Sequence, residues 1–262
     1  NLINNETVSI LNFGNIPLSK NGNQFREFSG TINTTEIPAI RLDTSLSSSF
    51  RESNINIASL SNWNTENVTS MDDMFYRCYE LGDGVNVNLS NWNTSNVIDC
   101  HEMFRECFTL GNNADFTIDG WNLSNCTDLN AMFFRCLGYG IDGYNSGNID
   151  FINLTIGNGT NEINLTNMFY EIHCDVDVAG LSIKNTTSMV NLFYNCDSFK
   201  GTGLSSSSVT TGTNCNAKTM FNNCYELGNN VDIDLDNWNM SNVINCDNMF
   251  SNCPNLGNDA QF

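Results

Sequence analysis

Residues 92–110 read WNTSNVIDCHEMFRECFTL, and versions of this stretch recur along the chain with many positions in register. Each copy carries the pair Met-Phe or, once, Leu-Phe, and successive copies are 24 to 36 residues apart. The pairs begin at Met74, Met103, Met132, Met168, Leu192, Met220 and Met249. Phe25 and Phe50 continue the pattern upstream in weaker form. A repeat of this length indicates a solenoid, because each unit can bury its apolar face only against its neighbours.

Each copy has two halves with different hydrophobic periods. Residues 85–89 and 231–236 alternate apolar and polar side chains, which predicts short strands with one buried face. Residues 67–78 carry apolar side chains at relative positions 0, 3, 6, 7 and 10, which predicts a short helix. Asparagines stand where such helices need an N-cap, at Asn67, Asn96, Asn125 and Asn242.

These two halves predict an α/β repeat solenoid that is leucine-rich-repeat-like. Parallel strands would line one face and short helices the other, joined by right-handed crossovers. Residues 54–262 form the regular repeats and residues 1–53 are divergent N-terminal repeats, and no linker divides this single continuous domain. Four tryptophans lie eleven residues before a Met, and this fixed spacing predicts that they belong to the core: Trp63, Trp92, Trp121 and Trp238.

Composition excludes several classes of partner. The chain has 262 residues and a net charge of −19, so we expect it to repel nucleic acids and anionic membrane surfaces. No apolar run approaches the ~18 residues of a membrane-spanning helix, and we expect no membrane insertion. Asparagine is unusually common, with 47 residues. The 11 cysteines in a lysine-poor chain favour an oxidising, extracellular or cell-surface location.

The repeat in residues 92–110 resembles a short repeat of bacterial and protist surface lipoproteins, written L-x-x-W-D-T-S-N-V-T-x-M-x-x-M-F-x-x-C-x-x-L. That repeat is related to the BspA-like leucine-rich repeats. The resemblance covers roughly residues 54–262, whereas residues 1–53 match poorly. It implies a leucine-rich-repeat-like solenoid on a cell surface without catalytic residues to carry over. The chain departs from the pattern by having Asn directly after Trp, at Asn64, Asn93, Asn122 and Asn239.

The sequence contains no motif that predicts an enzyme, a cofactor or a metal site. Cys100–His101 and His173–Cys174 are adjacent in sequence, which does not bring a nucleophile and its base together. We therefore expect no catalytic residues, and His101 should face solvent. Two acidic rows on predicted strands offer too few converging oxygens for Ca²⁺, and we expect solvated faces there. They comprise Asp175 and Asp177, and Asp232, Asp234 and Asp236.

Twelve Asn-x-Ser/Thr sequons are present, of which composition alone would supply roughly eight. Position is more informative than number, because Asn93, Asn122 and Asn239 share one slot directly after Trp. We predict that these three carry N-glycans in an exposed turn. Further candidate sites are Asn5, Asn33, Asn88, Asn153, Asn158, Asn164 and Asn185. The sequons at Asn67 and Asn125 should be less occupied, because a glycan would compete with the predicted helix cap.

The cysteines fall into two slots of the repeat. The late slot, four residues after Met, holds Cys78, Cys107, Cys136, Cys196, Cys224 and Cys253. The early slot holds Cys100, Cys126, Cys215 and Cys246, and is filled only where the preceding unit has a late cysteine. This co-occurrence predicts the disulfides Cys78–Cys100, Cys107–Cys126, Cys196–Cys215 and Cys224–Cys246, with Cys136–Cys174 across the long unit. Cys253 would be unpaired or bonded outside this segment. Buried reduced thiols remain the alternative.

The sequence predicts an extracellular structural or adhesive repeat glycoprotein, part of a surface fibre or filament. The alternative is a soluble leucine-rich-repeat-like module that recognises a protein or glycan through its sheet face. Residues 253–262 repeat the pattern of residues 107–116, so the sequence stops where a new strand should start, and neither end looks capped. This favours the structural interpretation. We therefore expect self-association or continuation into further repeats, and a cell-surface or glycan partner is compatible with either interpretation.

Overall fold

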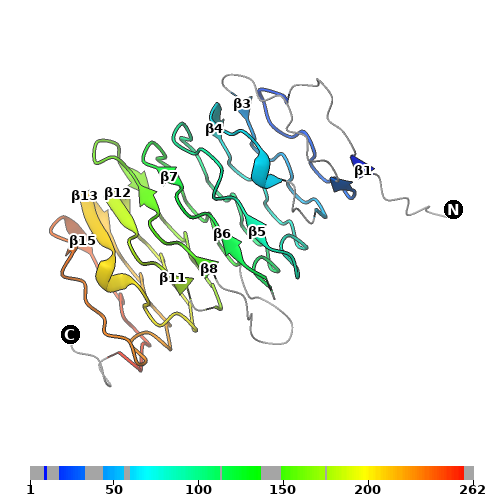
Figure 1. Ribbon diagram of the computed structural model, residues 1–262. Helices are drawn as coiled ribbons and strands as arrows, with labels where there is room; N and C mark the ends of the chain where they lie inside the picture. Colours follow the sequence, from blue (N-terminus) through cyan, green and yellow to red (C-terminus); the bar gives the residue numbers. More distant parts are fainter. Residues whose placement is uncertain are drawn as a thin grey trace.

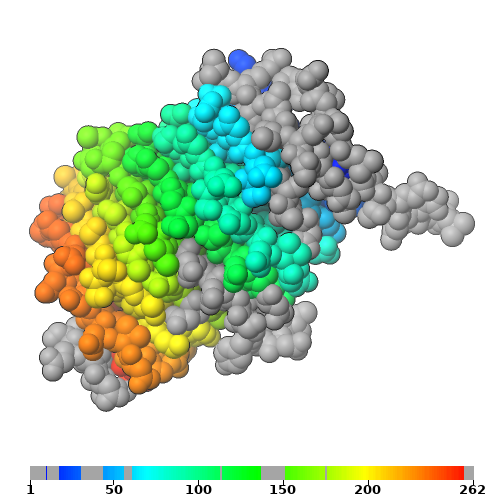
Figure 2. Space-filling view, viewed as in Figure 1, coloured from blue at the N-terminus to red at the C-terminus, as the bar shows by residue number. Residues whose placement is uncertain are grey.

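The computed structural model describes residues 9–10, 18–32, 44–55, 60–112, 114–136, 149–174 and 176–256. Its chain winds into a β-solenoid in which successive coils stack side by side, with β1 (Ser9–Ile10) and β15 (Val243–Asn245) at opposite ends (Figure 1). In sequence order the coils form consecutive bands across the molecular surface (Figure 2). The described residues contain no α-helix and only two 3₁₀ turns, η1 (Leu60–Asn62) and η2 (Leu204–Ser206). The predicted α/β, leucine-rich-repeat-like architecture is therefore wrong.

The strands are short and pair in parallel, which confirms the predicted strand direction. They are β2 (Thr31–Ile32), β3 (Thr44–Ser45), β4 (Val68–Ser70), β5 (Val87–Asn88), β6 (Phe116–Thr117), β7 (Asn122–Leu123), β8 (Ile149–Asp150), β9 (Thr155–Ile156), β10 (Ile163–Asn164), β11 (Val176–Asp177), β12 (Ser182–Ser188), β13 (Ser208–Asn216) and β14 (Trp238–Asn239), besides β1 and β15. One sheet has the order β14-β13-β12-β9-β7, with β10 on β12 and β15 on β13. A second has the order β11-β8-β6-β5, and β1-β2 and β3-β4 form separate pairs.

Only part of the predicted strand pattern forms strands. Within residues 85–89, only β5 is a strand. Residues 231–236 keep the alternation of more buried and exposed side chains but form no strand. The apolar alternation therefore identifies the buried face correctly, although it overstates the length of backbone pairing.

Four-residue turns replace the predicted helices. The Met74 N–H donates to the Met71 carbonyl at 3.2 Å, and the Cys78 N–H donates to the Phe75 carbonyl at 3.0 Å. The third residue of each turn has a positive φ, such as 55° at Asp73, which is the geometry of a type II turn and not of a helix. The first and fourth residues of each turn point into the core. Two consecutive turns thus place apolar side chains at positions 0, 3, 4 and 7, the spacing that also predicts a helix.

The remaining backbone groups of these turns bond to the next coil. The N–H groups of Asp73 and Phe75 donate to the carbonyls of His101 and Met103, both at 2.8 Å. A helix would use these donors within its own segment. The solenoid therefore satisfies its buried backbone through the coil-to-coil ladder and through the turns.

The positive-φ positions account for part of the asparagine content. Among the described residues, 22 non-glycine residues have a positive φ, and 11 of them are Asn. Asparagine tolerates this region better than most residues do. The repeat thus needs Asn for backbone conformation as well as for hydrogen bonding.

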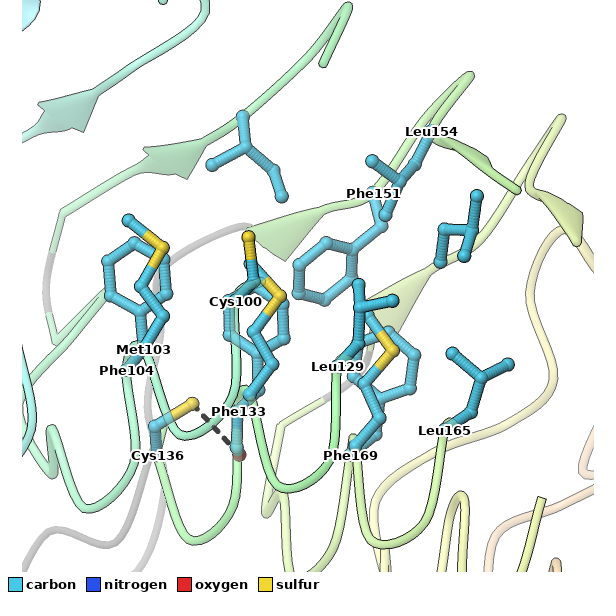
Figure 3. Packing of buried hydrophobic residues seen from close by; sticks show 14 of the residues in the cluster. Cys100, Met103, Phe104, Leu129, Phe133, Cys136, Phe151, Leu154, Leu165 and Phe169 are labelled. Atoms are coloured by element: carbon cyan, nitrogen blue, oxygen red, sulfur yellow. Dashed lines mark hydrogen bonds between the residues drawn. The ribbon is translucent and has the colours of Figure 1, made fainter. Parts of the chain in front are cut away.

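The core is built around a column of parallel phenylalanine rings that runs along the solenoid axis. Adjacent rings have centroids 5.1–5.7 Å apart, and part of the column is seen in Figure 3. The column comprises Phe25, Phe50, Phe75, Phe104, Phe133, Phe169, Phe193, Phe221 and Phe250. All four tryptophans are buried, as predicted, and the Trp121 indole N–H donates to the Leu89 carbonyl at 2.8 Å.

Candidate functional site

One regular surface is a polar face, which we define as the outward side chains of the sheet that contains β7, β10, β12, β13 and β14, together with exposed residues beside these strands. Its exposed members include Asn122, Thr127, Lys184, Thr210, Thr213, Asn214, Asn239 and Asn242. Contacts between coils order this face: the Asn185 N–H donates to Thr210 Oγ1 at 3.2 Å, and Asn242 Nδ2 donates to the Thr211 carbonyl at 2.9 Å. The face therefore offers amide and hydroxyl groups on a repeating spacing with little charge.

The slot directly after Trp contributes to this surface, since Asn122 lies in β7 and Asn239 in β14. Asn93, Asn122 and Asn239 are exposed, as predicted. Each side-chain oxygen accepts the backbone N–H two residues on, at 3.1, 3.0 and 3.1 Å respectively, in an Asx turn. An Asp side chain could accept the same backbone N–H, so Asn can stand at a position where the resembling repeat has Asp without loss of the Asx turn. Glycosylation of these exposed side chains stays a prediction.

The other sequons differ in exposure. Asn88, Asn153 and Asn158 are exposed, whereas Asn164 and Asn185 are half-buried. The predicted sites Asn5 and Asn33 lie outside the described residues. These surroundings make the half-buried pair the poorer acceptors of a bulky glycan.

The predicted N-caps have another role, because no helix follows them. Nδ2 of Asn96 donates to the Glu66 carbonyl, and Nδ2 of Asn125 to the Ser95 carbonyl, each at 2.7 Å. These asparagines therefore join neighbouring coils, and the assignment of this slot, Asn67 included, to helix capping is wrong.

Aspartates in adjacent coils form an acidic ladder between β4 and β10. Isolated bridges connect Ser70 to Asp99 and Asp99 to Asp128, so the latter two side chains occupy equivalent positions in neighbouring coils. Burial raises the pKa of Asp99, and the nearby carboxylates of Asp72 and Asp128 add to the rise. Burial also raises the pKa of Asp73. At neutral pH the ionised carboxylates of this ladder repel one another, which lowers the stability of the folded protein.

A strip of arginines and aromatic rings was not anticipated from the sequence. The Arg51 guanidinium lies 3.9 Å from the centroid of the Tyr76 ring, and that of Arg105 lies 4.5 Å from the centroid of the Phe134 ring. Phe134 stacks on Tyr170 at 4.6 Å between centroids. The signal was the position after each core Phe, which holds Arg51, Tyr76, Arg105, Phe134, Tyr170 and Tyr194 in successive copies.

Carboxylates balance the charge of this strip. Arg77 Nε lies 2.8 Å from a Glu106 carboxylate oxygen, and Arg51 pairs with Asp73. Arg135 likewise pairs with Glu171 in the next coil. The strip therefore links coils by ion pairs and ring contacts and does not present an excess of positive charge.

Ten of the eleven cysteines are free thiols in the structure: Cys78, Cys100, Cys107, Cys126, Cys136, Cys196, Cys215, Cys224, Cys246 and Cys253. The thiols of Cys100 and Cys126 interact directly, as do those of Cys224 and Cys253, and neither is a pair expected from the sequence. Burial raises the pKa of the Cys78 thiol to about 12 and that of the Cys215 thiol to about 11. The predicted disulfides stay predictions.

The early slot consists of two different positions. The Cys100 N–H donates to the next coil, as does that of Met71. By contrast, the Cys126 N–H closes a turn within its own coil, as does that of Val97, and Cys215 is in register with Val243. Unequal coil lengths hide this difference in the sequence.

The remaining polar candidates stand apart from one another. His101 is only half-exposed and lies 3.7 Å from a Glu102 carboxylate oxygen, and His173 Nδ1 lies 2.9 Å from an Asp197 carboxylate oxygen. The acidic row Asp232, Asp234 and Asp236 is exposed, and Asp177 Oδ1 accepts the Ala179 N–H at 2.8 Å. Asp175 lies outside the described residues. Within the described ranges, no three His, Cys, Asp or Glu side chains converge closely enough to hold a metal ion.

Comparison with known proteins identifies one family. No curated protein and no solved structure matches the chain. The described part of the chain has no helix with the length and apolar character to cross a membrane.

One family, described as "Mycoplasma protein of unknown function, DUF285", matches residues 25–154 and 163–261. The match therefore begins within the N-terminal stretch that diverges from the regular repeat. That description names neither a lipoprotein nor a BspA-like repeat. Because the match covers most of its length, this repeat-solenoid chain belongs to the DUF285 family.

Proposed function

We propose that this chain is a structural or adhesive repeat glycoprotein of the extracellular cell surface, part of a fibre or filament, without enzymatic activity. The observation that supports this most is the uninterrupted phenylalanine column, with ring spacings of 5.1–5.7 Å along the axis. Each coil repeats the same contacts with its neighbour, as in quasi-one-dimensional repeat proteins. Such a stack is suited to spanning distance rigidly.

The surface chemistry agrees with this role. A net charge of −19 keeps the chain soluble and discourages binding to anionic polymers. The exposed Asx turns at Asn93, Asn122 and Asn239 are the preferred places for N-glycans. The resemblance to surface lipoprotein repeats supports a cell-surface location, and self-association of the rods would extend them into filaments.

Negative-stain imaging of the purified protein tests the structural role. Filaments or ordered bundles are expected, and a uniform population of discrete particles at every concentration would contradict filament formation. Protease treatment of intact cells that produce the protein tests its location. Peptide mapping of the three Trp-linked asparagines tests glycosylation separately, since unmodified side chains would rule out only that part.

The polar face favours a second candidate, a ligand-binding module. Its ordered amide and hydroxyl groups suit a neutral glycan that bonds through many hydroxyls, because they present donors and acceptors with little charge. Co-sedimentation with insoluble neutral polysaccharides tests this function. Thr210→Lys on the face should weaken binding, whereas Glu80→Lys at an exposed position outside the face should leave it unchanged. Equal loss in both variants would indicate an unspecific charge effect.

A further inference from the structure

The late-slot cysteines make one contact repeatedly. Each of five thiols lies 2.8–2.9 Å from the main-chain carbonyl oxygen of the core phenylalanine in the preceding coil. The pairs are Cys78 with Phe50, Cys107 with Phe75, Cys196 with Phe169, Cys224 with Phe193 and Cys253 with Phe221. For Cys78, Cys107 and Cys196 the thiol S–H is the donor and the carbonyl oxygen is the acceptor. Cys224 and Cys253 also contact each other, so their two S–H groups are shared between that contact and the carbonyls.

The chain itself contains two natural comparisons for this slot. Ser53 occupies it one coil earlier, and its hydroxyl donates to the Phe25 carbonyl at 2.6 Å. Ile172 occupies it after Cys136, and there the Phe133 carbonyl receives the thiol of Cys136 from its own coil at 3.1 Å (Figure 3). The slot thus accepts a serine that donates in the same way. Because the Ile172 side chain has no donor, the Phe133 carbonyl accepts a hydrogen bond from the thiol of Cys136 instead.

The acceptor carbonyls have room for this second bond. The Phe75 carbonyl already receives the N–H of Cys78 within its own turn at 3.0 Å, and the thiol of Cys107 approaches from the next coil at 2.9 Å. A carbonyl oxygen has two lone pairs, so both bonds can form. In a buried site each such bond gives the thiol S–H an acceptor and occupies the second lone pair of the carbonyl oxygen.

We propose that the late-slot cysteines form a ladder of reduced thiols whose S–H groups join adjacent coils, so that the fold is sensitive to oxidation. A disulfide or a mixed disulfide at these positions has no S–H to donate. Burial supports the protonated state independently, because it raises the pKa of the Cys78 thiol to about 12 and also raises the pKa values of Cys107 and Cys196.

Oxidised glutathione is a defined reagent for testing this sensitivity. During refolding, a cysteine gives its proton to water, and its thiolate attacks one glutathione sulfur. A protein–glutathione disulfide forms while the glutathione S–S bond breaks and one glutathione thiolate leaves. Each such step removes one donor from the ladder and adds bulk to a buried slot. The proposal therefore expects protein refolded in this oxidant to have a lower urea midpoint than protein refolded in reductant.

Two measurements on the full chain decide the matter. The first is alkylation in denaturant without reductant, followed by intact mass. The six late-slot cysteines should all react, whereas protection of any of them by a disulfide would overturn the proposal. A higher urea midpoint after oxidative refolding would overturn it as well, since stabilisation is what a disulfide ladder would provide.

The second is infrared spectroscopy of the S–H stretch, which shifts to lower frequency when a thiol donates. Cys107→Ser should remove intensity from the shifted band and keep the donor, as Ser53 does in the same slot. Cys246→Ser is the matched control, because that thiol is exposed and should contribute at the unshifted position. Loss of unshifted intensity in Cys107→Ser would contradict the proposed donor role.

Discussion

Residues with left-handed backbone conformations recur from coil to coil, and some of them are of types that disfavour this conformation. Ala131 has a φ of 54° and is 2% exposed, although alanine strongly disfavours this region. The left-handed conformation costs a non-glycine residue roughly 1–2 kcal/mol, and glycine adds at most about 1 kcal/mol of unfolded-state entropy. Ala131→Gly should therefore raise the free energy of unfolding by roughly 0.5–1 kcal/mol, measured by urea denaturation.

Ala217→Gly is the control for that change. Ala217 is fully buried but is not among the positive-φ residues, so the glycine should lower stability by about 1 kcal/mol. Equal losses in the two variants would mean that backbone conformation does not determine the response at Ala131.

The acidic ladder predicts a pH dependence at Asp99. Its pKa is raised in the folded protein above 3.8, chiefly by burial, so the folded state binds its proton more tightly than the unfolded chain. The contribution of Asp99 to the free energy of unfolding is therefore fully present below pH 3.8. It is lost as the pH rises through the raised pKa of the folded state. Asp99→Asn keeps the acceptor for the His101 N–H, at 2.9 Å in the wild type, and removes the charge.

Asp99→Asn should consequently raise the urea midpoint at pH 7 and leave it nearly unchanged at pH 3. The gain should stay below about 1 kcal/mol, because a half-exposed carboxylate is partly screened. Asp232→Asn, on an exposed side chain in a distant coil, is the control and should show no such difference between the two pH values. A gain of equal size at pH 3 would show that charge is not the cause.

Among the elements, the coils differ in length, and glycines stand where the backbone of a longer coil packs closely on its neighbours. Gly157 has a φ of 78°, and a Cβ placed there would lie 2.1 Å from Ile163 Cδ1 and 2.5 Å from the Lys184 carbonyl oxygen. Gly157→Ala should therefore lower the free energy of unfolding by more than about 2 kcal/mol through clash and backbone strain together. Thermal denaturation followed by circular dichroism measures the loss.

Gly159 offers a matched comparison two residues away. Its φ is 86°, but no heavy atom lies within 4 Å of an added Cβ. Gly159→Ala should show the backbone strain alone, about 1–2 kcal/mol. If Gly159→Ala costs as much as Gly157→Ala, the close approach of Ile163 and Lys184 contributes nothing measurable.

The elements also show how far the sequence alone could lead. Repetition, parallel strands, buried tryptophans and the late cysteine column followed from spacing, because these depend on which side chains point inward. The predicted helix was wrong because a helix and two consecutive type II turns give inward-facing side chains the same spacing. The residues with this spacing are Met71, Met74, Phe75 and Cys78. Only the positive φ of residues such as Asp73 separates the two, and Asp carries a weak signal for it.

The candidate surfaces were predictable to a similar extent. The exposure of Asn93 and its equivalents followed from their repeated position after Trp. The sorting of the early cysteines did not follow, because Cys126 and Cys100 take different positions that depend on where each turn closes. The reduced-thiol contacts also required three-dimensional knowledge of which carbonyl each late cysteine faces.

Across the whole molecule, stability is transmitted through neighbouring coils, and the phenylalanine column is its clearest route. Phe133 lies at the middle of the column, with ring centroids 5.3 Å from Phe104, 5.7 Å from Phe169 and 4.8 Å from Phe151. Phe133→Ala should lower the free energy of unfolding by about 3–5 kcal/mol, because it leaves a cavity in a fully buried site. Urea denaturation followed by circular dichroism gives this value.

The spatial pattern of the Phe133→Ala effect tests the nearest-neighbour character of the solenoid. Amide hydrogen exchange should rise most at the ladder bonds beside the cavity, such as the Phe104 N–H to Met132 carbonyl bond, and least at the distant Phe221 N–H to Met249 carbonyl bond. Phe25→Ala is the control, since its ring is half-buried and should cost less. An equal rise in exchange at both bonds would mean that all coils unfold as one cooperative unit, because protection would then depend only on global stability.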